Sequence, residues 1–487
     1  MKRERQEYTP EARCWITSIR STIKKLISKN SVPTEIRTHI PQGVNDLIGC
    51  RVITGSNALV LENATCNARS QESNIENFYV FNVLDYGAKG DGITYDTKAF
   101  EATWIEACKV EGSIMMVPSD YDFLVGPISF SGSHCEKNIV FQLDGRIIAP
   151  TNTKVWGVLQ WLEFSKLNGI CVKGKGIIDG QGSVWWKIAP FLLIEEYEGD
   201  YPEEQDDYAP KIALISSTSK GKMPRTRPAA LKFYGSSNVV VTGITIQNSP
   251  KAHLKFDNCV AVQVSGITVS SPGDSPNTDG IHLQNSQNVV INSSHIACGD
   301  DCISIQTGSS AVFIHDVHCG PGHGFSIGGL GKDNTKACVS NITVQDSTLQ
   351  NTMTGVRIKT WQGGSGSVQG IMFSNIHVSD VKIPIMIDQF YCDKRKCGNH
   401  TSAVAISGVS YQSIKGTYSY KPVHFACSDS VPCTGVSLAD IELKPSPEKK
   451  HFYGPYCWET YGELRTNTTP PIDCIQPDKR IPSYDSC

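Results

Sequence analysis

The segment VTGITIQNS, residues 241–249, sets a pattern that five later segments repeat. These are VSGITVSSP (264–272), INSSHIACG (291–299), IHDVHCGPG (314–322), VSNITVQDS (339–347) and FSNIHVSDV (373–381). Superposing them gives one shared phase, at intervals of 23, 27, 23, 25 and 34 residues, occupied by Ile246, Val269, Ile296, Cys319, Val344 and Val378. Each repeat has two or three short β-branched runs separated by Asn, Gly or Ser, with no helix between them. The sequence therefore predicts a stack of coils, a parallel β-solenoid, because a β-propeller would need longer repeats.

The composition agrees with a turn-rich, all-β chain. The 487 residues include 42 glycines, and 39% are apolar, which is enough to bury a large core. The 45 Lys and Arg residues nearly balance the 48 Asp and Glu residues, for a net charge of -3. This balance argues against nucleic acid or an anionic membrane as a partner, and a polyanion would have to be bound locally.

A short capping helix is predicted at the amino-terminal end of the solenoid. The strand-like segment FNVLDYG begins at Phe81 and leads through a glycine turn into a helical pattern from Thr97 to Lys109. Asp96 is the expected N-cap of this helix. Spacings of three and four place one apolar face on it, formed by Ala99, Phe100, Trp104 and Cys108. We expect that face to cover the open end of the stacked sheet.

Two stretches depart from the repeat. Residues 187–228 are an acidic and aromatic run followed by a polar, basic one, so we expect a loop insertion without chemistry. Residues 1–78 are atypical: the first 30 carry eight Lys or Arg and lack the continuous apolar run of a signal peptide. This segment is expected to be disordered or to come from a wrong start site. The predicted catalytic β-helix spans residues 79–445, and residues 446–487 form a Cys-containing tail.

The cysteines indicate an oxidising compartment. There are 18, an even number, and close neighbours include Cys298 and Cys302, Cys392 and Cys397, and Cys427 and Cys433. Zinc binding is the rival interpretation, but no His lies at matching spacing beside them, so disulfides are expected. Glycosylation sequons agree with secretion and begin at Asn63, Asn292, Asn341, Asn399 and Asn467.

Four short segments carry the residues expected to do chemistry. They are Asn277-Thr278-Asp279, Gly299-Asp300-Asp301, Gly322-His323-Gly324 and Arg357-Ile358-Lys359. Asp279 and Asp300 are 21 residues apart and His323 follows Asp300 by 23, so each interval is close to one coil. Because adjacent coils lie about 4.8 Å apart, these side chains should meet on one wall as a carboxylate cluster.

Cleavage of a glycosidic bond needs such a cluster. One carboxylic acid protonates the departing oxygen, and another carboxylate activates water or attacks the anomeric carbon. Mutual repulsion should raise the pKa of at least one aspartate and favour an acidic optimum. Arg357 and Lys359 alternate on one strand and could bind sugar carboxylates. His323, between two glycines, could approach an aspartate and hydrogen-bond it.

Each of these elements has a structural explanation when it is taken alone. An Asp-Asp pair is more often a solvated turn or a calcium ligand than a catalytic pair. An Arg-x-Lys strand is usually a solvated face, and a His beside Gly is usually a turn residue. The coincidence of all of them at coil-length spacing favours the catalytic interpretation.

These segments resemble a known family. In order, NTDGIHL (277–283), CGDDCISIQTG (298–308), CGPGHGFSIGGLG (319–331) and GVRIKTW (355–361) are similar to the four signature segments of polygalacturonases, glycoside hydrolase family 28. The resemblance covers roughly residues 79–440, including FNVLDYGAKGDG (81–92) and IDQFYCD (387–393), and points to the plant branch. It implies a right-handed, single-stranded parallel β-helix and an inverting mechanism. It also implies hydrolysis without a metal or other cofactor.

The resemblance also implies roles for the site residues. Asp300 would be the general acid, and Asp279 and Asp301 would position and deprotonate the attacking water. His323 would support the acid.

The residues expected to bind substrate are Asn277, Arg357, Lys359 and Tyr391. By the resemblance, the two cations would hold galacturonate carboxylates and Tyr391 would line the product-side subsite. The expected partner is polygalacturonate, the backbone of pectin, and the expected protein is a secreted monomer of the cell wall.

Three rival functions stay open at this point. A pectate lyase on the same scaffold would eliminate rather than hydrolyse, using calcium and an arginine base. A rhamnogalacturonan or xylogalacturonan hydrolase is the nearer alternative. The third alternative is a non-catalytic carbohydrate-binding solenoid. Endo or exo action is likewise undecided.

Overall fold

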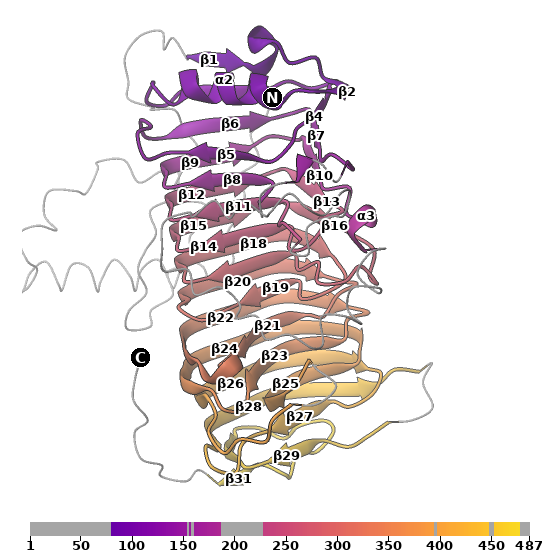
Figure 1. Cartoon of the computed structure of the whole chain (residues 1–487). Helices are drawn as coiled ribbons and strands as arrows, with labels where there is room; N and C mark the ends of the chain where they lie inside the picture. Colours follow the sequence, from indigo (N-terminus) through magenta and orange to yellow (C-terminus); the bar gives the residue numbers. More distant parts are fainter. Residues whose placement is uncertain are drawn as a thin grey trace, which may run out of the picture. The chain divides into compact units, whose positions relative to one another are not determined.

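The computed structural model describes residues 79–152, 155–156, 160–186, 227–393, 397–447 and 452–477 (Figure 1). The predicted segment 1–78, residues 187–226 of the predicted insertion and residues 478–487 of the predicted tail lie outside the described residues. None of the helices within the described ranges is long and apolar enough to cross a membrane.

One parallel sheet, here called the front sheet, receives one strand from each coil. Its eleven strands in the described residues are β5 (Ile128–Ser131), β8 (Leu162–Ser165), β11 (Leu231–Tyr234), β14 (Leu254–Asp257), β17 (Ile281–Gln284), β19 (Ile303–Ile305), β21 (Phe325–Leu330), β23 (Thr354–Trp361), β25 (Ile383–Tyr391), β27 (Val423–Ala426) and β29 (Tyr456–Trp458). The register is continuous: Leu254 pairs with Ile281, and Ile281 pairs with Ile303. Each coil therefore repeats the inward and outward alternation of the coil before it.

The second sheet, here called the back sheet, forms the rest of each coil. In the early coils its strands are short: β1 (Val80–Asn82), β2 (Asp91–Tyr95), β3 (Ile114–Val117), β4 (Asp122–Leu124), β6 (Ile139–Leu143), β7 (Arg146–Ile148), β9 (Asn168–Lys173), β10 (Ile177–Asp179), β12 (Ser237–Thr242), β13 (Thr245–Gln247), β15 (Val260–Ser265) and β16 (Thr268–Ser270). In the later coils most are longer: β18 (Gln287–Ala297), β20 (Ser310–Cys319), β22 (Lys336–Gln350), β24 (Ser365–Val381), β26 (Ala405–Tyr418), β28 (Cys433–Pro445), β30 (Thr460–Leu464) and β31 (Gln476–Pro477).

The long strands bend at residues in the left-handed conformation. Ser293 in β18 has φ 47° and Asp316 in β20 has φ 54°, and these two residues lie opposite each other in the pairing of the strands. Gly266, with φ 60°, occupies the same bend one coil earlier. Gly adopts this conformation without strain, and Asn and Asp tolerate it better than other residues. This requirement explains the Asn, Gly and Ser residues between the β-branched runs.

The fold is the predicted right-handed parallel β-helix. The repeat register was predicted correctly for the first four members, which pair in succession: Ile246, Val269, Ile296 and Cys319.

The predicted position of the fifth member of the repeat, Val344, is wrong. Cys319 pairs with Leu349, and Leu349 pairs with Val378, whereas Val344 pairs with Ile314. Strand β22 carries the same apolar alternation on both sides of its bend, so the sequence pattern fits either side equally well.

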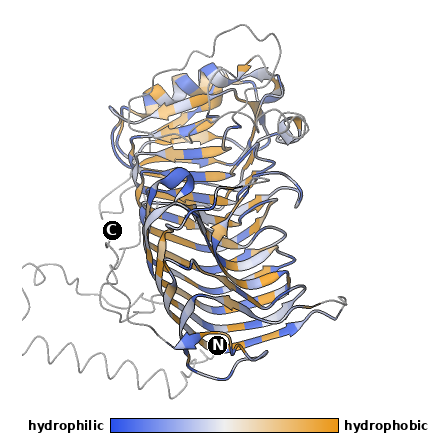
Figure 2. Ribbon diagram, turned by 60° about the horizontal axis from the view of Figure 1, so that its bottom comes forward, coloured by the Kyte–Doolittle hydropathy of each residue, from blue (hydrophilic) through white to orange (hydrophobic). Residues whose placement is uncertain are grey.

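The core lies between the two sheets and runs the length of the stack. Strands alternate hydrophobic and hydrophilic residues along their length (Figure 2). Phe130, Phe164, Phe233 and Phe256 occupy one inward position on successive front-sheet strands and are fully buried. Their rings follow one another at centroid distances of 4.7, 5.3 and 5.2 Å. A stack of parallel, in-register strands places identical side chains face to face, which gives offset aromatic stacking along the axis.

The predicted capping helix is α2 (Thr97–Ala107), and it buries Ala99, Phe100 and Trp104. Asp96 makes no side-chain cap; its carboxylate instead accepts hydrogen bonds from the backbone N–H groups of Lys89 and Gly90. The predicted strand FNVLDYG is shorter than expected, because β1 gives way to the 3-10 helix η2 (Val83–Tyr86). The other two short helices in the described residues are α3 (Ser183–Trp186) and η5 (Lys332–Asn334).

Disulfides join several of the cysteines. The bonds between described residues with both partners assigned are Cys108–Cys135, Cys302–Cys319, Cys392–Cys397, Cys427–Cys433 and Cys457–Cys474. The close neighbours Cys298 and Cys302 are not bonded to each other: Cys298 is a buried free thiol. Beyond residue 445, β29 and β30 pair with β27 and β28, so the stacking continues into the predicted tail.

Candidate active site

Three of the predicted site residues share one position on successive coils of the front sheet. Strand pairing aligns Ile281 of β17 with Ile303 of β19 and Phe325 of β21. Two residues before these lie Asp279, Asp301 and His323. The sequence had placed Asp300 in this phase, but the register assigns the position to Asp301. The predicted clustering on one wall is thus present, with a shift of one residue in the middle coil.

The turn that carries the two adjacent aspartates is held by close packing. The Gly299 N–H donates to Thr278 Oγ1 at 2.9 Å. A Cβ on Gly299 would lie 1.9 Å from the carbonyl oxygen of Ser275, so this position has no room for a side chain. The Cys298 thiol donates to the carbonyl of Asp300 at 3.2 Å. Burial raises the pKa of that thiol, and Cys298 is therefore a structural rather than a reactive cysteine.

Asp301 is the electrostatic centre of the site. Arg357 Nη2 donates to its Oδ1 at 2.6 Å and Lys359 Nζ donates to its Oδ2 at 2.9 Å. Ser326 Oγ also donates to Oδ1, at 2.7 Å. The Asp301 side chain is only 2% exposed. Burial opposes ionisation, but Lys359 and Arg357 outweigh it and lower the pKa of Asp301 to about 2. Asp301 is therefore an anion across the mildly acidic range.

The two cations are less available than the sequence suggested. Arg357 is 4% exposed and Lys359 is 7% exposed. Both direct a charged nitrogen to Asp301, so a substrate carboxylate would have to share them. Ser326, which pairs with Arg357 across the sheet, receives a further hydrogen bond from Arg357 Nε at 3.0 Å. Sequence reasoning missed Ser326, although it lies inside a quoted segment and one coil before Arg357.

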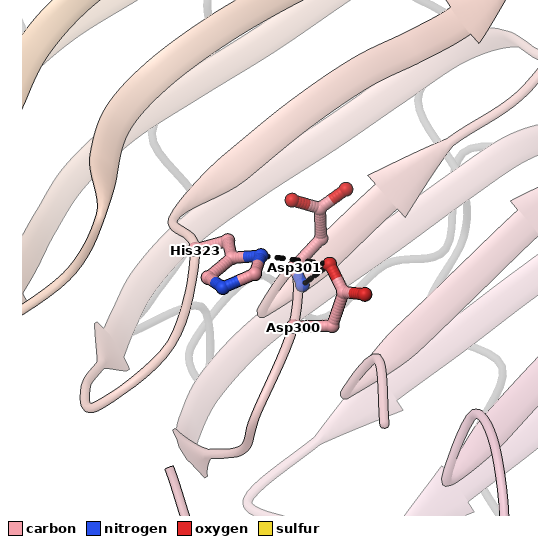
Figure 3. A group of neighbouring side chains, drawn as sticks. All are labelled: Asp300, Asp301 and His323. Atoms are coloured by element: carbon pink, nitrogen blue, oxygen red, sulfur yellow. Dashed lines mark hydrogen bonds and ion pairs between the residues drawn. The ribbon is translucent and has the colours of Figure 1, made fainter. Parts of the chain in front are cut away.

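Asp300 lies beside Asp301 and faces His323 (Figure 3). His323 Nδ1 lies 2.9 Å from Asp300 Oδ1, which also accepts the Asp301 N–H at 2.8 Å. The side chains of Asp300 and His323 are 19% and 31% exposed, so both can reach a bound molecule. The predicted pairing of His323 with an aspartate is present, and Asp300 is its partner.

Asp279 has a histidine of its own. His282 Nδ1 lies 3.1 Å from Asp279 Oδ2, and burial, with Lys255 and Lys251, lowers the pKa of His282 to about 3. Burial raises the pKa of Asp279 well above its ordinary value, and repulsion from Asp300 and Asp301 raises it further. The predicted rise in the pKa of one aspartate therefore falls on Asp279. His282 was missed, although an outward position three residues after Asp279 was a usable signal.

The buried His253 fixes Asp279 from the preceding coil. Its backbone N–H donates to the Asp279 carbonyl at 2.8 Å, and its Nδ1 lies 2.9 Å from the same oxygen. Burial lowers the pKa of His253 to about 4, so this ring is uncharged at pH values well above 4.

Asn277 joins the site to the end of the predicted insertion. Its Nδ2 lies 3.5 Å from Asp300 Oδ2, at the limit of a hydrogen bond. Arg227 Nη2 donates to Asn277 Oδ1 at 2.7 Å, and its Nη1 donates to the Pro276 carbonyl at 2.9 Å. Asn277 has φ 56°, a conformation that asparagine tolerates. No chemistry was predicted for residues 187–228, and nothing in the sequence signals that Arg227 reaches the site.

Tyr391 lies on the carboxyl-terminal side of the cluster. Lys359 Nζ is 5.1 Å from the centroid of its ring, and Trp361 packs edge-on against it at 5.4 Å. A cavity of about 150 Å³ opens beside these two aromatic residues. Its other walls are Asp333, Asn334, Gln362, Cys397, Gly398 and His400. Tyr391, the predicted product-side residue, therefore lines a cavity and also contacts Lys359 of the charged cluster.

The donor atoms of the cluster fit a resident metal poorly. Asp300, Asp301 and His323 each offer one ligand atom, all within 4.8 Å of one another. However, both oxygens of Asp301 accept hydrogen bonds from protein cations, and His323 Nδ1 is engaged by Asp300. A divalent ion would have to displace Arg357 and Lys359. The prediction that no metal is needed stays a prediction, and a chelator tests it.

Together these residues can carry out acid–base chemistry on a bound acetal. Asp301 supplies a fixed negative charge, while burial and the charges of Asp300 and Asp301 raise the pKa of Asp279 and favour its protonated form. A protonated carboxyl beside an ionised one is the combination that glycosidic cleavage needs.

Comparisons with known proteins identify the family. The family model described as glycosyl hydrolases family 28 matches residues 108–190 and 215–454. A probable polygalacturonase of Arabidopsis thaliana is 39% identical over 82% of this chain and 85% of its own length. Polygalacturonase-2 of Solanum lycopersicum is 39% identical over 75% of each chain.

Solved structures agree on the fold. The polygalacturonase of Erwinia carotovora superposes with a TM-score of 0.61 and 21% identity, over 82% of this chain and 100% of that one. The exopolygalacturonase of Thermotoga maritima gives a TM-score of 0.58 and 22% identity, over 77% of this chain and 90% of that one. The family match extends over the coils that carry all three aspartates, and this chain belongs to glycosyl hydrolase family 28.

Proposed function

We propose that this chain is a polygalacturonase, which hydrolyses the α-1,4-galacturonosidic bonds of homogalacturonan in pectin. Family membership and the names of its plant relatives support the substrate class. The observation that carries the proposal is the buried Asp301 held between Arg357 and Lys359, with Asp279 and Asp300 in the neighbouring positions. A hydrolase acting on an acidic polymer needs both carboxylates for chemistry and cations near them.

In the proposed mechanism, Asp300 protonates the departing glycosidic oxygen. Its partial exposure and its contact with His323 suit this role, because His323 can orient the acid and exchange protons with it. Catalysis uses the form of the site in which Asp300 carries the acid proton and Asp279 is ionised. Asp279 and Asp301 are then both anions and can orient a water molecule and accept its proton. Attack by that water on the face opposite the leaving group inverts the anomeric centre.

Arg357 and Lys359 can bind substrate because Asp301 neutralises only one of their two positive charges. Two positive groups share one buried carboxylate, so Arg357, Lys359 and Asp301 together carry a net charge of one positive unit. A galacturonate carboxylate beside Tyr391 would be attracted to this unit. Asn277 would contribute an amide to the same sugar or its neighbour. The protein is proposed to act outside the cell, on the wall, as a monomer without cofactor.

Sizing of the products from polygalacturonate by chromatography tests this proposal. We expect saturated oligogalacturonates or galacturonate, formed equally well in the presence of a chelator. Products that absorb in the ultraviolet through a new double bond, or activity abolished by the chelator, would identify a calcium-dependent lyase instead. The sizes of the first products also show whether the enzyme acts inside the chain or from its end.

A further inference from the structure

A cluster of exposed and half-buried aromatic residues around one lysine lies at the last coils of the front sheet. We call it the aromatic–lysine surface and define it as Tyr420, Lys421, His424, Tyr453, Tyr456 and Trp458. Tyr453, Tyr456 and Trp458 are 54%, 40% and 48% exposed. In β29 the intervening Cys457 packs against the core and is disulfide-bonded to Cys474, so Tyr456 and Trp458 face outward.

Five members of this surface contact one another, while the sixth, Trp458, donates a hydrogen bond from Nε1 to Asp429 Oδ1 at 2.8 Å. The rings of His424 and Tyr456 stack at 5.1 Å, and those of Tyr420 and Tyr453 lie 4.7 Å apart. Lys421 Nζ is 5.0 Å from the ring centroid of Tyr456 and 6.0 Å from that of Tyr453. Its Nζ also lies 3.4 Å from His424 Nδ1. The aromatic faces and the cation are therefore pre-arranged, which lowers the entropy lost when a ligand binds.

Strand register connects this surface to the active site. One outward column runs from Arg357 through Met386 and His424 to Tyr456. The neighbouring column runs from Lys359 through Asp388 and Ala426 to Trp458. Three coils separate the two ends of each column, a distance of about 14 Å along the axis. A polymer leaving the site on the side of Tyr391 would meet this surface next.

The chemistry of the surface suits one kind of ligand. The apolar faces of pyranose rings pack on exposed Tyr and Trp rings, and the negative charges of a polyuronate pair with lysines between them. Lys382 Nζ, 5.5 Å from the ring of Tyr420, adds a second cation at the edge. A neutral polysaccharide would contact the aromatic rings but would have no charge to pair with the lysines. The alignment of this surface with Arg357 favours the substrate polymer over another protein as the ligand.

We propose that the aromatic–lysine surface binds the uronic-acid residues of the substrate polymer beyond the site of cleavage, on the product side. This proposal rests on the proposed function, because it takes the bound polymer to be the one that is cut. It makes the enzyme favour long chains, since short oligomers cannot reach Tyr456 and Trp458 while occupying the catalytic aspartates.

The test compares a Tyr456→Ala/Trp458→Ala double variant with wild type and with Tyr95→Ala. Tyr95 is 45% exposed at the amino-terminal end of the back sheet and serves as the matched control. Retention on immobilised polygalacturonate is measured first, because it does not depend on turnover. KM values for long polygalacturonate and for trigalacturonate follow.

Loss of two ring contacts should raise the KM for the long polymer about tenfold relative to the KM for the trimer. Retention should fall in the double variant and stay at the wild-type value in Tyr95→Ala. Lys421→Gln, which leaves β29 intact, should weaken retention on polygalacturonate but not on a neutral dextran matrix. Thermal unfolding checks that each variant is folded.

Unchanged retention and an unchanged KM ratio in the folded double variant would overturn the proposal. A change of molecular mass in solution without a change in polymer binding would assign the surface to contacts between two copies of the chain, and would overturn it as well. Failure of wild type to cleave polygalacturonate would contradict the proposed function, while the retention comparison would still decide whether the surface binds polyuronate.

Discussion

The charges around Asp301 are the residue-scale feature on which the site depends. A carboxylate that is 2% exposed survives as an anion because Lys359 and Arg357 neutralise it. Its pKa of about 2, against an ordinary 3.8, corresponds to a stabilisation of about 2 kcal/mol. Because the folded pKa is depressed, this stabilisation is present above about pH 4 and is lost as pH falls towards 2.

Replacing Arg357 should therefore affect both stability and catalysis. Arg357→Met leaves Asp301 with one cation, and we expect the free energy of unfolding to fall by about 3 kcal/mol at pH 6. The kcat/KM on polygalacturonate should fall steeply, because the pKa of Asp301 rises. The control is Arg465→Met, which removes a cation 2.7 Å from Glu463 in a pair whose side chains are 61% and 60% exposed. That variant should lose about 1 kcal/mol or less and keep its turnover. Equal losses in both variants would contradict this account.

For Asp279 we predict the opposite dependence of the free energy of unfolding on pH. Its folded pKa is raised, so its neutral form contributes stability at low pH that is lost as pH rises through the folded pKa. Asp279→Asn should therefore raise the free energy of unfolding at pH 7 and change it much less at pH 4. Thermal unfolding at the two pH values measures this. Asp120→Asn, at an exposed turn, is the control. A less stable Asp279→Asn at pH 7 would show that burial does not disfavour this charge.

At the scale of the elements, the site depends on how tightly neighbouring coils approach. Gly299 allows the Asp300–Asp301 turn to lie against Ser275, where a Cβ would meet the carbonyl oxygen at 1.9 Å. Gly299→Ala should push the turn outward and lower kcat about 100-fold. Gly454→Ala is the control, since nothing lies within 4 Å of a Cβ there. Wild-type kcat in a folded Gly299→Ala would contradict the proposed positioning role.

The sequence predicts elements well where one side chain type recurs, and poorly where two halves of a coil look alike. The in-register pairs from Ile246 to Cys319 follow from β-branched runs between left-handed residues. Val344 was misplaced because β22 is apolar in the same alternation on either side of its bend. Asp300 and Asp301 differ by one position, and only strand pairing shows which of them shares a phase with Asp279.

Contacts between residues that are far apart in the sequence were harder to predict. The sequence places Arg357 and Lys359 on one face, but their shared partner Asp301 is 56 and 58 residues away. His282 and Ser326 could have been found from outward positions beside predicted site residues. Arg227 could not, because its approach to Asn277 depends on the path of a segment without a repeat.

At the scale of the whole chain, stability in a solenoid is a sum of coils and the contacts between them. The Cys302–Cys319 disulfide closes a separation of 17 residues between two buried cysteines directly behind the aspartate turn. Cys392–Cys397 closes a separation of 5 residues.

Serine replacement of Cys302 and Cys319 together should therefore lower the free energy of unfolding by about 3 kcal/mol and reduce turnover. The Cys392→Ser/Cys397→Ser variant is the matched control and should lose less. Urea unfolding of both variants measures the difference. A larger loss in the control would show that the carboxyl-terminal loop, rather than the aspartate coil, limits stability.

The turnover of Asp300→Asn on polygalacturonate tests the account most directly, with retention on immobilised polygalacturonate measured alongside. The amide preserves the size of the side chain but has no proton to give to a departing oxygen. We expect kcat to fall by at least about 1,000-fold while retention stays close to wild type, and Asp316→Asn, an exposed aspartate on the back sheet, to keep full activity. Asp300→Asn that cleaves polygalacturonate at the wild-type rate would show that this carboxyl is not the acid.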